Sequence, residues 1–397
     1  MTDFAWTKDQ FHLPEGVIYL DGNSLGPMPK ATPARVQQAM VPEWRDQLIG
    51  GWVGAGWHLA PERLGDRIAA MIGAEKGHVV VGDTLSIKIY QALAAALALR
   101  PERRVILSDT GNFPSDLYMA QGLARTLGNG TVLKTVEPED VADYITEEVA
   151  VLMLTEVDYR TGRRHDMKAL TQKAHEVGAL TVWDLAHSFG ALPVDLAGCG
   201  ADFAAGCTYK YINAGPGAPA FIYVAPQHAG QTDTALQGWQ GHDAPFAFEH
   251  DYRPASEVVR MRVGTPPVLQ LAALEAALDI WEQVDMQEVR ARSIMLTETF
   301  IAGVEATCPE LHLASPRNPE ERGSQVSFNF EEGYAAMQAL IARGVIGDFR
   351  APDIMRFGFT PLFIGLGEVA RAVDILAEIM RDRLWDRPEY KVKAIVT

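Results

Sequence analysis

Between about Val79 and Val224, short apolar runs alternate with longer segments whose hydrophobic residues recur at helical spacing. This alternation is typical of a mostly parallel sheet covered by helices. We expect strands, buried on both faces, at Val105–Ser108, Val149–Leu154, Ala179–Trp183 and Asp202–Ala205. We expect helices at Ile87–Leu99, at Asp116–Leu127 and from a capping Asp166 to Glu176. The fold class is therefore α/β, with helices on both faces of the sheet.

After about Gly264 the pattern changes to long amphipathic segments. They predict helices Val268–Val284 and Met286–Thr307, a strand Gln325–Phe330 and a last helix Glu368–Leu384. The first 40 residues are too rich in proline for an early sheet and should run over the surface to join this part. We expect a large domain at residues 45–263 and a smaller α+β domain formed by residues 1–44 and 264–397.

In such sheets, ligands bind in the crevice beyond the carboxyl ends of the strands. Polar segments that directly follow an apolar run are therefore the candidates for a site. They are Asp83–Ser86, Asn112–Asp116, Thr155–Asp158, Asp184–His187 and Thr208–Lys210.

Lys210 stands at the end of a run of small residues that begins at Ala201. Lysine is rarely buried, so a lysine at the end of an interior strand needs a chemical reason. An aldehyde cofactor supplies one, because a lysine amine attacks an aldehyde to form an imine. The alternative is a lysine whose ammonium group reaches water from the strand end. Taken alone, Lys210 favours this alternative.

Asp184 ends the preceding apolar run, and His187 follows three residues later. A carboxylate against the nitrogen of a pyridine ring keeps that nitrogen protonated, so the ring can accept electrons from a substrate carbanion. His187 would hold the carboxylate in place or stack beside the ring. The alternative is a helix-capping Asp and an ordinary core histidine. Asp and Lys at the ends of consecutive strands are less common together, and the pair favours a cofactor site.

Two further segments could complete such a site. Asp83–Ser86 precede an expected helix, where backbone N–H groups and hydroxyls suit a phosphate monoester. Ordinary capping by Asp83 or Thr84 is compatible with that role. After another expected strand, Phe113 would lie on the face of a cofactor ring and Asp116 would reach a ring substituent. On its own, this second segment is a plain loop.

Other enzyme patterns are excluded. Gly22–Gly26 matches the GxSxG pattern of serine hydrolases, but Pro27 and Pro29 block the helix that must follow Ser24. No GxGxxG segment opens a helix, so a dinucleotide dehydrogenase is not indicated. HExxH and similar metal-binding patterns are also absent, and we expect no metal.

The composition narrows the class of protein further. The net charge of −16 argues against nucleic acid as a partner, because that affinity depends on Lys and Arg. The three cysteines, Cys199, Cys207 and Cys308, form no CxxC pair and indicate a reducing compartment. No basic segment followed by an apolar run opens the chain, and no stretch approaches about 18 uncharged apolar residues. We expect a cytoplasmic protein with no membrane partner.

Taken together, these features resemble the aspartate-aminotransferase superfamily of pyridoxal-phosphate enzymes (fold type I), and within it the kynureninase family in its bacterial form. The resemblance covers nearly the whole chain. Its most specific segments are the Gly-Trp-Gln-Gly-His and Tyr-Lys-Tyr stretches. The matching segments are Leu20–Pro27, Asn112–Asp116, Trp183–Ser188, Cys207–Tyr211, Gly238–His242, Arg262–Thr265 and Ile354–Phe359.

The resemblance implies a role for each matching position. Lys210 would form the Schiff base with pyridoxal 5′-phosphate, Asp184 would pair with the pyridine nitrogen, and Phe113 would stack on the ring. The phosphate would be held by Leu85, Ser86, Tyr209 and Trp239, and the rest of the cofactor site would be formed by Asp116, Thr155 and His187. Arg356 would bind the substrate α-carboxylate, and Thr265 would lie near the phosphate or the aryl group.

The resemblance also implies a homodimer, in which Trp239 and Thr265 come from the partner subunit. The implied reaction is hydrolytic cleavage of L-kynurenine to anthranilate and L-alanine, with Lys210 moving the α-proton and Tyr209 serving as a later acid–base group. Thr265 stands where some relatives carry Asn, which leaves the preference for kynurenine or 3-hydroxykynurenine open. An aryl pocket is required, and its candidates are Trp57, His58 and Phe359.

Two alternatives remain. A cysteine desulfurase shares this fold but needs a thiolate on a mobile loop. Cys308 is the only candidate outside the core region of the large domain, and we interpret it as structural because it follows a long helical pattern. A non-catalytic binding protein on the same scaffold is disfavoured, since Lys210, Asp184 and Arg356 are all present.

Overall fold

A seven-stranded sheet forms the centre of the computed structural model, which describes residues 1–393. The strand order is β2 (Val79–Val81), β8 (Phe221–Val224), β7 (Phe203–Gly206), β6 (Leu180–Asp184), β5 (Val149–Thr155), β3 (Val105–Asp109) and β4 (Val132–Val136). The five strands from β7 to β4 run parallel, whereas β8 is antiparallel to both of its neighbours. The four predicted strands are confirmed, each within one residue of its expected ends. The α/β fold class is therefore confirmed.

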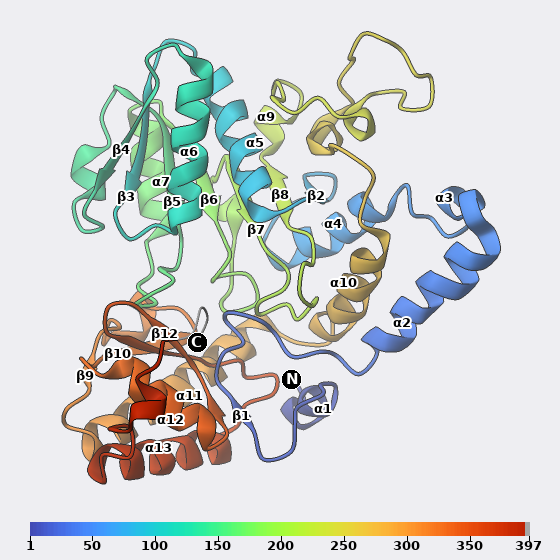
Figure 1. Cartoon of the computed structure of the whole chain (residues 1–397). Helices are drawn as coiled ribbons and strands as arrows, with labels where there is room; N and C mark the ends of the chain where they lie inside the picture. The colour runs from blue at the N-terminus through green and yellow to red at the C-terminus, as the bar shows by residue number, and fades with distance from the viewer. Residues whose placement is uncertain (394–397) are drawn as a thin grey trace.

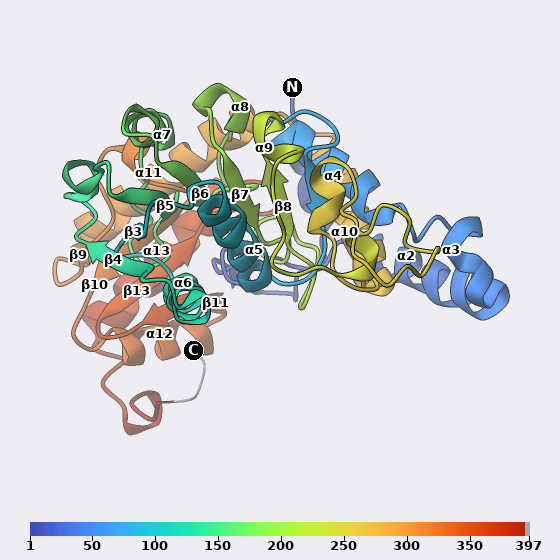
Figure 2. The ribbon, with the colours of Figure 1, turned by 90° about the horizontal axis from the view of Figure 1, so that it is seen from above.

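Helices cover both faces of this sheet (Figure 2). On one face lie α5 (Leu85–Ala98) and α6 (Pro114–Leu127), and on the other lie α4 (Ala60–Met71), α7 (Met167–Glu176) and α8 (Leu196–Cys199). Every residue of β5 and β6 is buried, as expected of strands that are covered on both sides. Asp166 caps α7 as predicted, because its Oδ1 accepts a hydrogen bond from the backbone N–H of Ala169 at 2.9 Å.

A smaller unit packs against the sheet domain (Figure 1). Its antiparallel sheet has the order β12 (Asp348–Arg350), β13 (Ile354–Gly358), β10 (Gln325–Asn329) and β9 (His312–Leu313). Its helices are α11 (Met286–Thr307), α12 (Gly333–Ala342) and α13 (Leu366–Arg381). The predicted bounds of α11 are confirmed, whereas β9, β12, β13 and α12 are additional elements that the pattern did not reveal.

The N-terminal segment joins the smaller unit, as predicted. It contributes a two-residue strand, β1 (Ile18–Tyr19), which pairs in parallel with β11 (Val345–Ile346). We propose the division into residues 45–263 and residues 1–44 with 264–397 on this basis. Helix α10 (Val268–Trp281) packs against α2 (Thr32–Gln38) and against α4 of the sheet domain. From α2 the chain continues as an arm through α3 (Gly51–Gly54), which projects from the body (Figure 1).

Among residues 1–393, no helix combines the length and the apolar character that crossing a membrane requires.

A buried carboxylate at the amino end of β7 connects three segments. Asp202 accepts hydrogen bonds from His228 and His175, both at 2.7 Å, and from the backbone N–H of Thr181 at 2.8 Å. Burial alone would raise the pKa of Asp202, but the two histidines lower it to about 2. The hydrogen bond with Asp202 raises the pKa of His175.

We expect Asp202→Asn to lower the free energy of unfolding by about 1–3 kcal/mol, because an amide offers one acceptor oxygen where two histidines donate. The contribution of Asp202 is present above the unfolded-state pKa near 3.8 and is lost as the pH falls toward 2. That of His175 is present below about 6.5 and is lost as the pH rises through its raised folded-state pKa. Denaturant unfolding should show the largest difference from the unsubstituted protein between about pH 4 and 6.5, whereas exposed Asp374→Asn should show none.

Candidate active site

A cavity of about 500 Å³ lies at the carboxyl ends of the parallel strands, where the smaller unit meets the sheet. Its wall is formed by Asn23, Ser24, Thr84, Leu85, Ser86, Phe113, Ser115, Thr155, Tyr159, Asp184, Ala186, His187, Tyr209, Lys210, Arg350 and Arg356. The sheet brings together the residues that follow its strands, because its parallel strands all end at the same edge. Asn23, Ser24, Arg350 and Arg356 come from the smaller unit.

Lys210 follows β7 and reaches across to the next strand end. Its Nζ lies 2.9 Å from Nε2 of His187. Burial and the charges of Lys210 and Arg356 hold the pKa of His187 well below its ordinary value, so the neutral ring accepts this hydrogen bond from the lysine. The other ring nitrogen, Nδ1, is buried without a partner. His187 therefore contacts the lysine, whereas we had expected it to hold Asp184 in place or to stack beside a ring.

Two acids are buried near this lysine. Asp184 lies opposite Thr155 in the register of β5 and β6; its Oδ1 accepts a hydrogen bond from the N–H of Ala186 at 2.8 Å, and its Oδ2 lies 3.3 Å from the Thr155 hydroxyl. Asp116 is fully buried, and neither of its carboxyl oxygens has a hydrogen-bond partner. Burial, with the charge of Asp184, raises the pKa of Asp116 well above its ordinary value, and burial also raises the pKa of Asp184. The surroundings of these two acids would stabilise a ligand that donates a proton or carries a positive charge.

The start of α5 offers an anion site. Thr84 is the N-cap residue but makes no side-chain cap bond, and the Asp83 carboxylate instead accepts a hydrogen bond from the buried Lys88 at 3.0 Å. The first N–H groups of a helix have no partner within the helix. Those of Leu85 and Ser86 therefore remain for an anion at the positive helix end.

On the side of the smaller unit, Arg356 on β13 is buried and paired with Asp348. Its Nε donates to Asp348 Oδ1 at 2.7 Å, and its Nη2 donates to the hydroxyl of Ser24 at 2.6 Å. At the mouth of the cavity, the rings of Phe113 and Tyr159 meet edge to face with centroids 5.0 Å apart. The cavity thus has an anion site, the buried acid Asp184 and an arginine at different points of its wall.

Most of the predicted site residues meet at this cavity, namely Leu85, Ser86, Phe113, Thr155, Asp184, His187, Tyr209, Lys210 and Arg356. Asp116, Trp239 and Thr265 do not line it in this chain. The Trp239 ring is 39% exposed and contacts the rings of Trp52 and Phe246 instead. The prediction of Phe359 as an aryl-pocket residue is wrong, because Phe359 is fully buried against Phe300 in the core of the smaller unit.

Trp57 and His58 also lie outside the cavity wall. The indole of Trp57 donates to Glu43 at 3.0 Å, and the ring of His58 packs against Phe246. The rings of Trp57 and His58 contact Trp52, as the ring of Trp239 does. Within a single chain, Trp57 and His58 thus belong to this aromatic group and not to the wall of the cavity.

Sequence reasoning missed four residues of the wall: Asn23, Ser24, Tyr159 and Arg350. The hydrolase interpretation of the segment around Ser24 was rejected correctly, since no helix follows before α2, but the serine reaches the cavity through the smaller unit. Arg350 lies on β12, six positions before Arg356 on the paired strand β13. A second arginine so close to Arg356 is the feature of the sequence that could have indicated Arg350 as a site residue.

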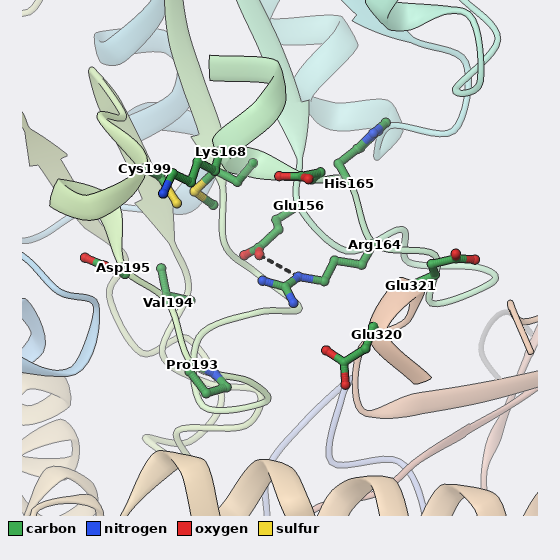
Figure 3. A pocket seen from close by; sticks show the side chains of 12 residues that line it. Glu156, Arg164, His165, Lys168, Pro193, Val194, Asp195, Cys199, Glu320 and Glu321 are labelled. Carbon is green, nitrogen blue, oxygen red and sulfur yellow. Dashed lines mark hydrogen bonds and ion pairs between the residues drawn. The ribbon is translucent and has the colours of Figure 1, made fainter. Parts of the chain in front are cut away.

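A second cavity, of about 310 Å³, lies on the other side of the segment that follows β5 (Figure 3). Here Arg164 Nε donates to Oε1 of the buried Glu156 at 3.0 Å, and the backbone N–H of Arg164 donates to the carbonyl of Glu321 at 2.7 Å. The ion pair lies within the segment that carries Tyr159, and the hydrogen bond to Glu321 connects this segment to the smaller unit. None of the predicted site residues lines this cavity.

The sequence of this chain is similar to those of known proteins, and the similarity shows its family. A family model described as the kynureninase C-terminal domain matches residues 289–376. The chain is 51% identical to the kynureninase of Pseudomonas fluorescens, over 98% of this chain and 95% of that protein. It is 49% identical to the kynureninase of Burkholderia pseudomallei (strain 1106a) with the same coverage. The chain belongs to the kynureninase family.

Solved structures with the same fold have sequences that are less similar to this chain than those of the kynureninases are. The apo structure of a cysteine desulfurase from Thermococcus onnurineus NA1 is 19% identical with a TM-score of 0.81, over 95% of this chain and 98% of that chain. A C-DES mutant with glycine covalently linked to its PLP cofactor is 17% identical with a TM-score of 0.78, over 94% and 99% of the two chains. At this identity the likeness shows the fold alone, and it confirms the fold type I architecture.

Kynureninases are pyridoxal-phosphate enzymes, and the residues of this cavity fit that cofactor. The helix start at Leu85 offers free N–H groups for a phosphate. Oδ2 of the buried Asp184 has only the 3.3 Å contact with the Thr155 hydroxyl, which leaves it able to accept a hydrogen bond from a protonated ring nitrogen. Lys210 supplies the amine for the aldehyde. Phe113, which is 42% exposed, offers a face for the ring.

We expect Asp184→Asn to retain the cofactor but to lose turnover by about a hundredfold or more, because an amide cannot hold a ring nitrogen protonated. Cofactor absorbance and steady-state rates measure the two effects separately. Asp140→Asn, at an exposed position remote from the cavity wall, is the matched control and should behave like the unsubstituted protein. Near-normal turnover of Asp184→Asn would show that another group serves the ring nitrogen.

Proposed function

We propose that this chain hydrolyses the β,γ carbon–carbon bond of L-kynurenine to give anthranilate and L-alanine. The observation that carries the proposal is about 50% identity to kynureninases over 98% of the chain. The cavity supports it, since the wall combines a lysine for the Schiff base, the buried acid Asp184, an anion site and an arginine.

Each residue of the cavity wall has a proposed task. Bound pyridoxal phosphate supplies an aldehyde for the substrate amine and a ring that accepts electrons. Leu85 and Ser86, with Tyr209, hold the phosphate, and Thr155, with Asp116, orients Asp184 toward the ring nitrogen. Lys210 holds the cofactor and then moves the proton at the substrate α-carbon. Neutral His187 orients the Nζ of Lys210 through the hydrogen bond at 2.9 Å.

Tyr209 is the proposed acid–base group for the later step, in which water has added to the side-chain ketone. Burial, with the charges of Cys207 and Asp184, raises the pKa of Tyr209. The phenol is therefore protonated at neutral pH and acts first as an acid. As the carbon–carbon bond breaks, the β-carbon keeps the electron pair and takes the phenol's proton, and the phenolate takes the proton that the hydrate hydroxyl loses. Its position in the wall beside Lys210 allows it to reach the same substrate.

We also propose that the active form is a homodimer in which Trp239 and Thr265 serve the partner's cavity. Both residues lie outside the wall of their own cavity, and Thr265 is exposed. The projecting arm between α2 and α3 carries a run of exposed apolar side chains, which a second copy would cover. They are Met40, Trp44, Leu48, Ile49 and Val53, with exposed fractions between 45% and 88%.

The cysteines argue against a desulfurase and for a cytoplasmic enzyme. All three are free, which fits a reducing compartment. Burial raises the pKa of Cys199 and of Cys207 to about 11, and it also raises the pKa of Cys308. Cys308 is fully buried at the end of α11, as predicted for a structural residue. A neutral, buried thiol cannot take sulfur from a substrate.

The decisive experiment mixes purified protein, pyridoxal phosphate and L-kynurenine and measures anthranilate and alanine. We expect both products in equal amounts, and Lys210→Ala should lose both turnover and the absorbance of the bound cofactor. Lys168→Ala, an exposed lysine on α7, is the control. Full activity of Lys210→Ala would refute the assignment. The same assay with 3-hydroxykynurenine measures the ring preference that Thr265 leaves open.

Tyr209→Phe should slow anthranilate release by about a hundredfold to ten-thousandfold while exchange of the α-proton changes little. The two steps respond differently because Lys210, and not Tyr209, handles the α-proton. Deuterium exchange and anthranilate release are measured in parallel. Equal slowing of both would mean that Tyr209 only anchors the phosphate.

A further inference from the structure

The hydrogen bonds of Arg356 leave it little capacity for a substrate carboxylate. A guanidinium has five N–H groups. Nε and one N–H of Nη2 bind Asp348, the other N–H of Nη2 binds Ser24, and Nη1 donates to the carbonyl of Tyr159 at 2.5 Å. One N–H, on Nη1, remains, whereas a carboxylate is held best by two parallel N–H groups.

Arg350 has the donors that Arg356 lacks. Its hydrogen bonds start from Nη2, which donates to Asp348 Oδ2 at 2.6 Å and lies 3.4 Å from the Ser24 hydroxyl. Its Nε is buried without a partner. The side chain lines the same cavity as Arg356 and is 36% exposed, so it is accessible from the cavity.

The charges around these arginines leave an excess of positive charge. Burial would raise the pKa of Asp348, but Arg356 and Arg350 lower it, so this carboxylate is ionised. Burial and the charge of Asp348 raise the pKa of the neighbouring Asp21 to about 7. Asp21 is therefore largely protonated just below neutral pH, and its buried Oδ1 has no partner. The two cations Arg350 and Arg356 then face the single anion Asp348, and one further carboxylate would balance the charge.

We propose that Arg350 is a second arginine for the α-carboxylate of the substrate and determines specificity for an amino acid with a free carboxyl group. Arg350 donates to the carboxylate from Nη1 and from the parallel N–H of Nη2 that Asp348 leaves free, while Asp348 keeps Arg356 in place. Arg356 contributes its remaining Nη1 hydrogen. This inference rests on the proposed function for the identity of the substrate.

The test compares Arg350→Gln with the unsubstituted holoenzyme. Loss of a charge-assisted hydrogen bond should raise the KM for L-kynurenine roughly tenfold to a hundredfold. The kcat should stay within about threefold, and the absorbance of the bound cofactor should not change. Arg350→Lys keeps the charge but not the paired N–H groups, so its KM should lie between the two. Arg343→Gln removes an arginine of the same unit that pairs with Glu378 on the surface, and should leave KM unchanged.

A comparison of acid and amide ligands separates direct contact from support of the fold. The α-carboxamide of L-kynurenine, used as a competitive inhibitor, lacks the carboxylate charge. If Arg350 contacts the carboxylate, Arg350→Gln should weaken binding of the acid and leave the inhibition constant of the amide nearly unchanged. Equal weakening of both, or an unchanged KM in Arg350→Gln, would overturn the proposal.

The same inference can be tested without turnover. Titration calorimetry with L-alanine and L-alaninamide should show that the unsubstituted holoenzyme prefers the acid and that Arg350→Gln loses this preference. An unsubstituted protein that releases no anthranilate would refute the proposed function alone. A preference for L-alanine that survives in Arg350→Gln would refute the role of Arg350 alone.

Discussion

The burial of two carboxyl groups, Asp184 and Asp116, at the end of the central sheet is the constraint on which the site depends. A buried carboxylate is costly unless hydrogen bonds and a cation compensate for the lost water. Here the Thr155 hydroxyl and the Ala186 N–H bind Asp184, and the charge of Lys210 acts on both acids. Because His187 is held neutral, the lysine is not opposed by a second buried cation at the same point. The arrangement is completed by a ligand that carries a protonated ring nitrogen and an aldehyde.

The smaller unit sets the distance between the buried acids at the end of the central sheet and the two arginines, Arg350 and Arg356. The segment between β5 and α7 belongs to the sheet domain, yet its carbonyls are bound by side chains of the smaller unit. Gln325 donates to the carbonyls of Asp158 and Tyr159, and Arg356 donates to the latter as well. The Tyr159 ring in turn packs against Phe113. The ring of Phe113 and the side chain of Arg356 are thus held by one connected set of contacts.

Much of the fold was predictable from local patterns. The strands β3, β5, β6 and β7 are apolar runs because they are buried on both faces, and helix α11 was predicted to its last residue. Most of the strands that were missed are short or only partly buried, whereas the missed helix α12 has 10 residues and is largely buried. Strand β4 lies at the sheet edge with a mixed burial pattern, and β12 and β13 form a hairpin whose arginines interrupt the apolar pattern.

The sequence by itself determined which chemical groups stand at the ends of consecutive strands, because parallel strands place their carboxyl ends at one edge. Lys210, Asp184, Thr155 and Phe113 were found in this way. Only the tertiary structure decided what these groups contact. It brought Ser24 and Arg350 to the cavity from the N-terminal segment and the smaller unit, and it placed Phe359 in a core against Phe300. Such contacts join residues hundreds of positions apart, and no local periodicity records them because packing between the two units brings them together.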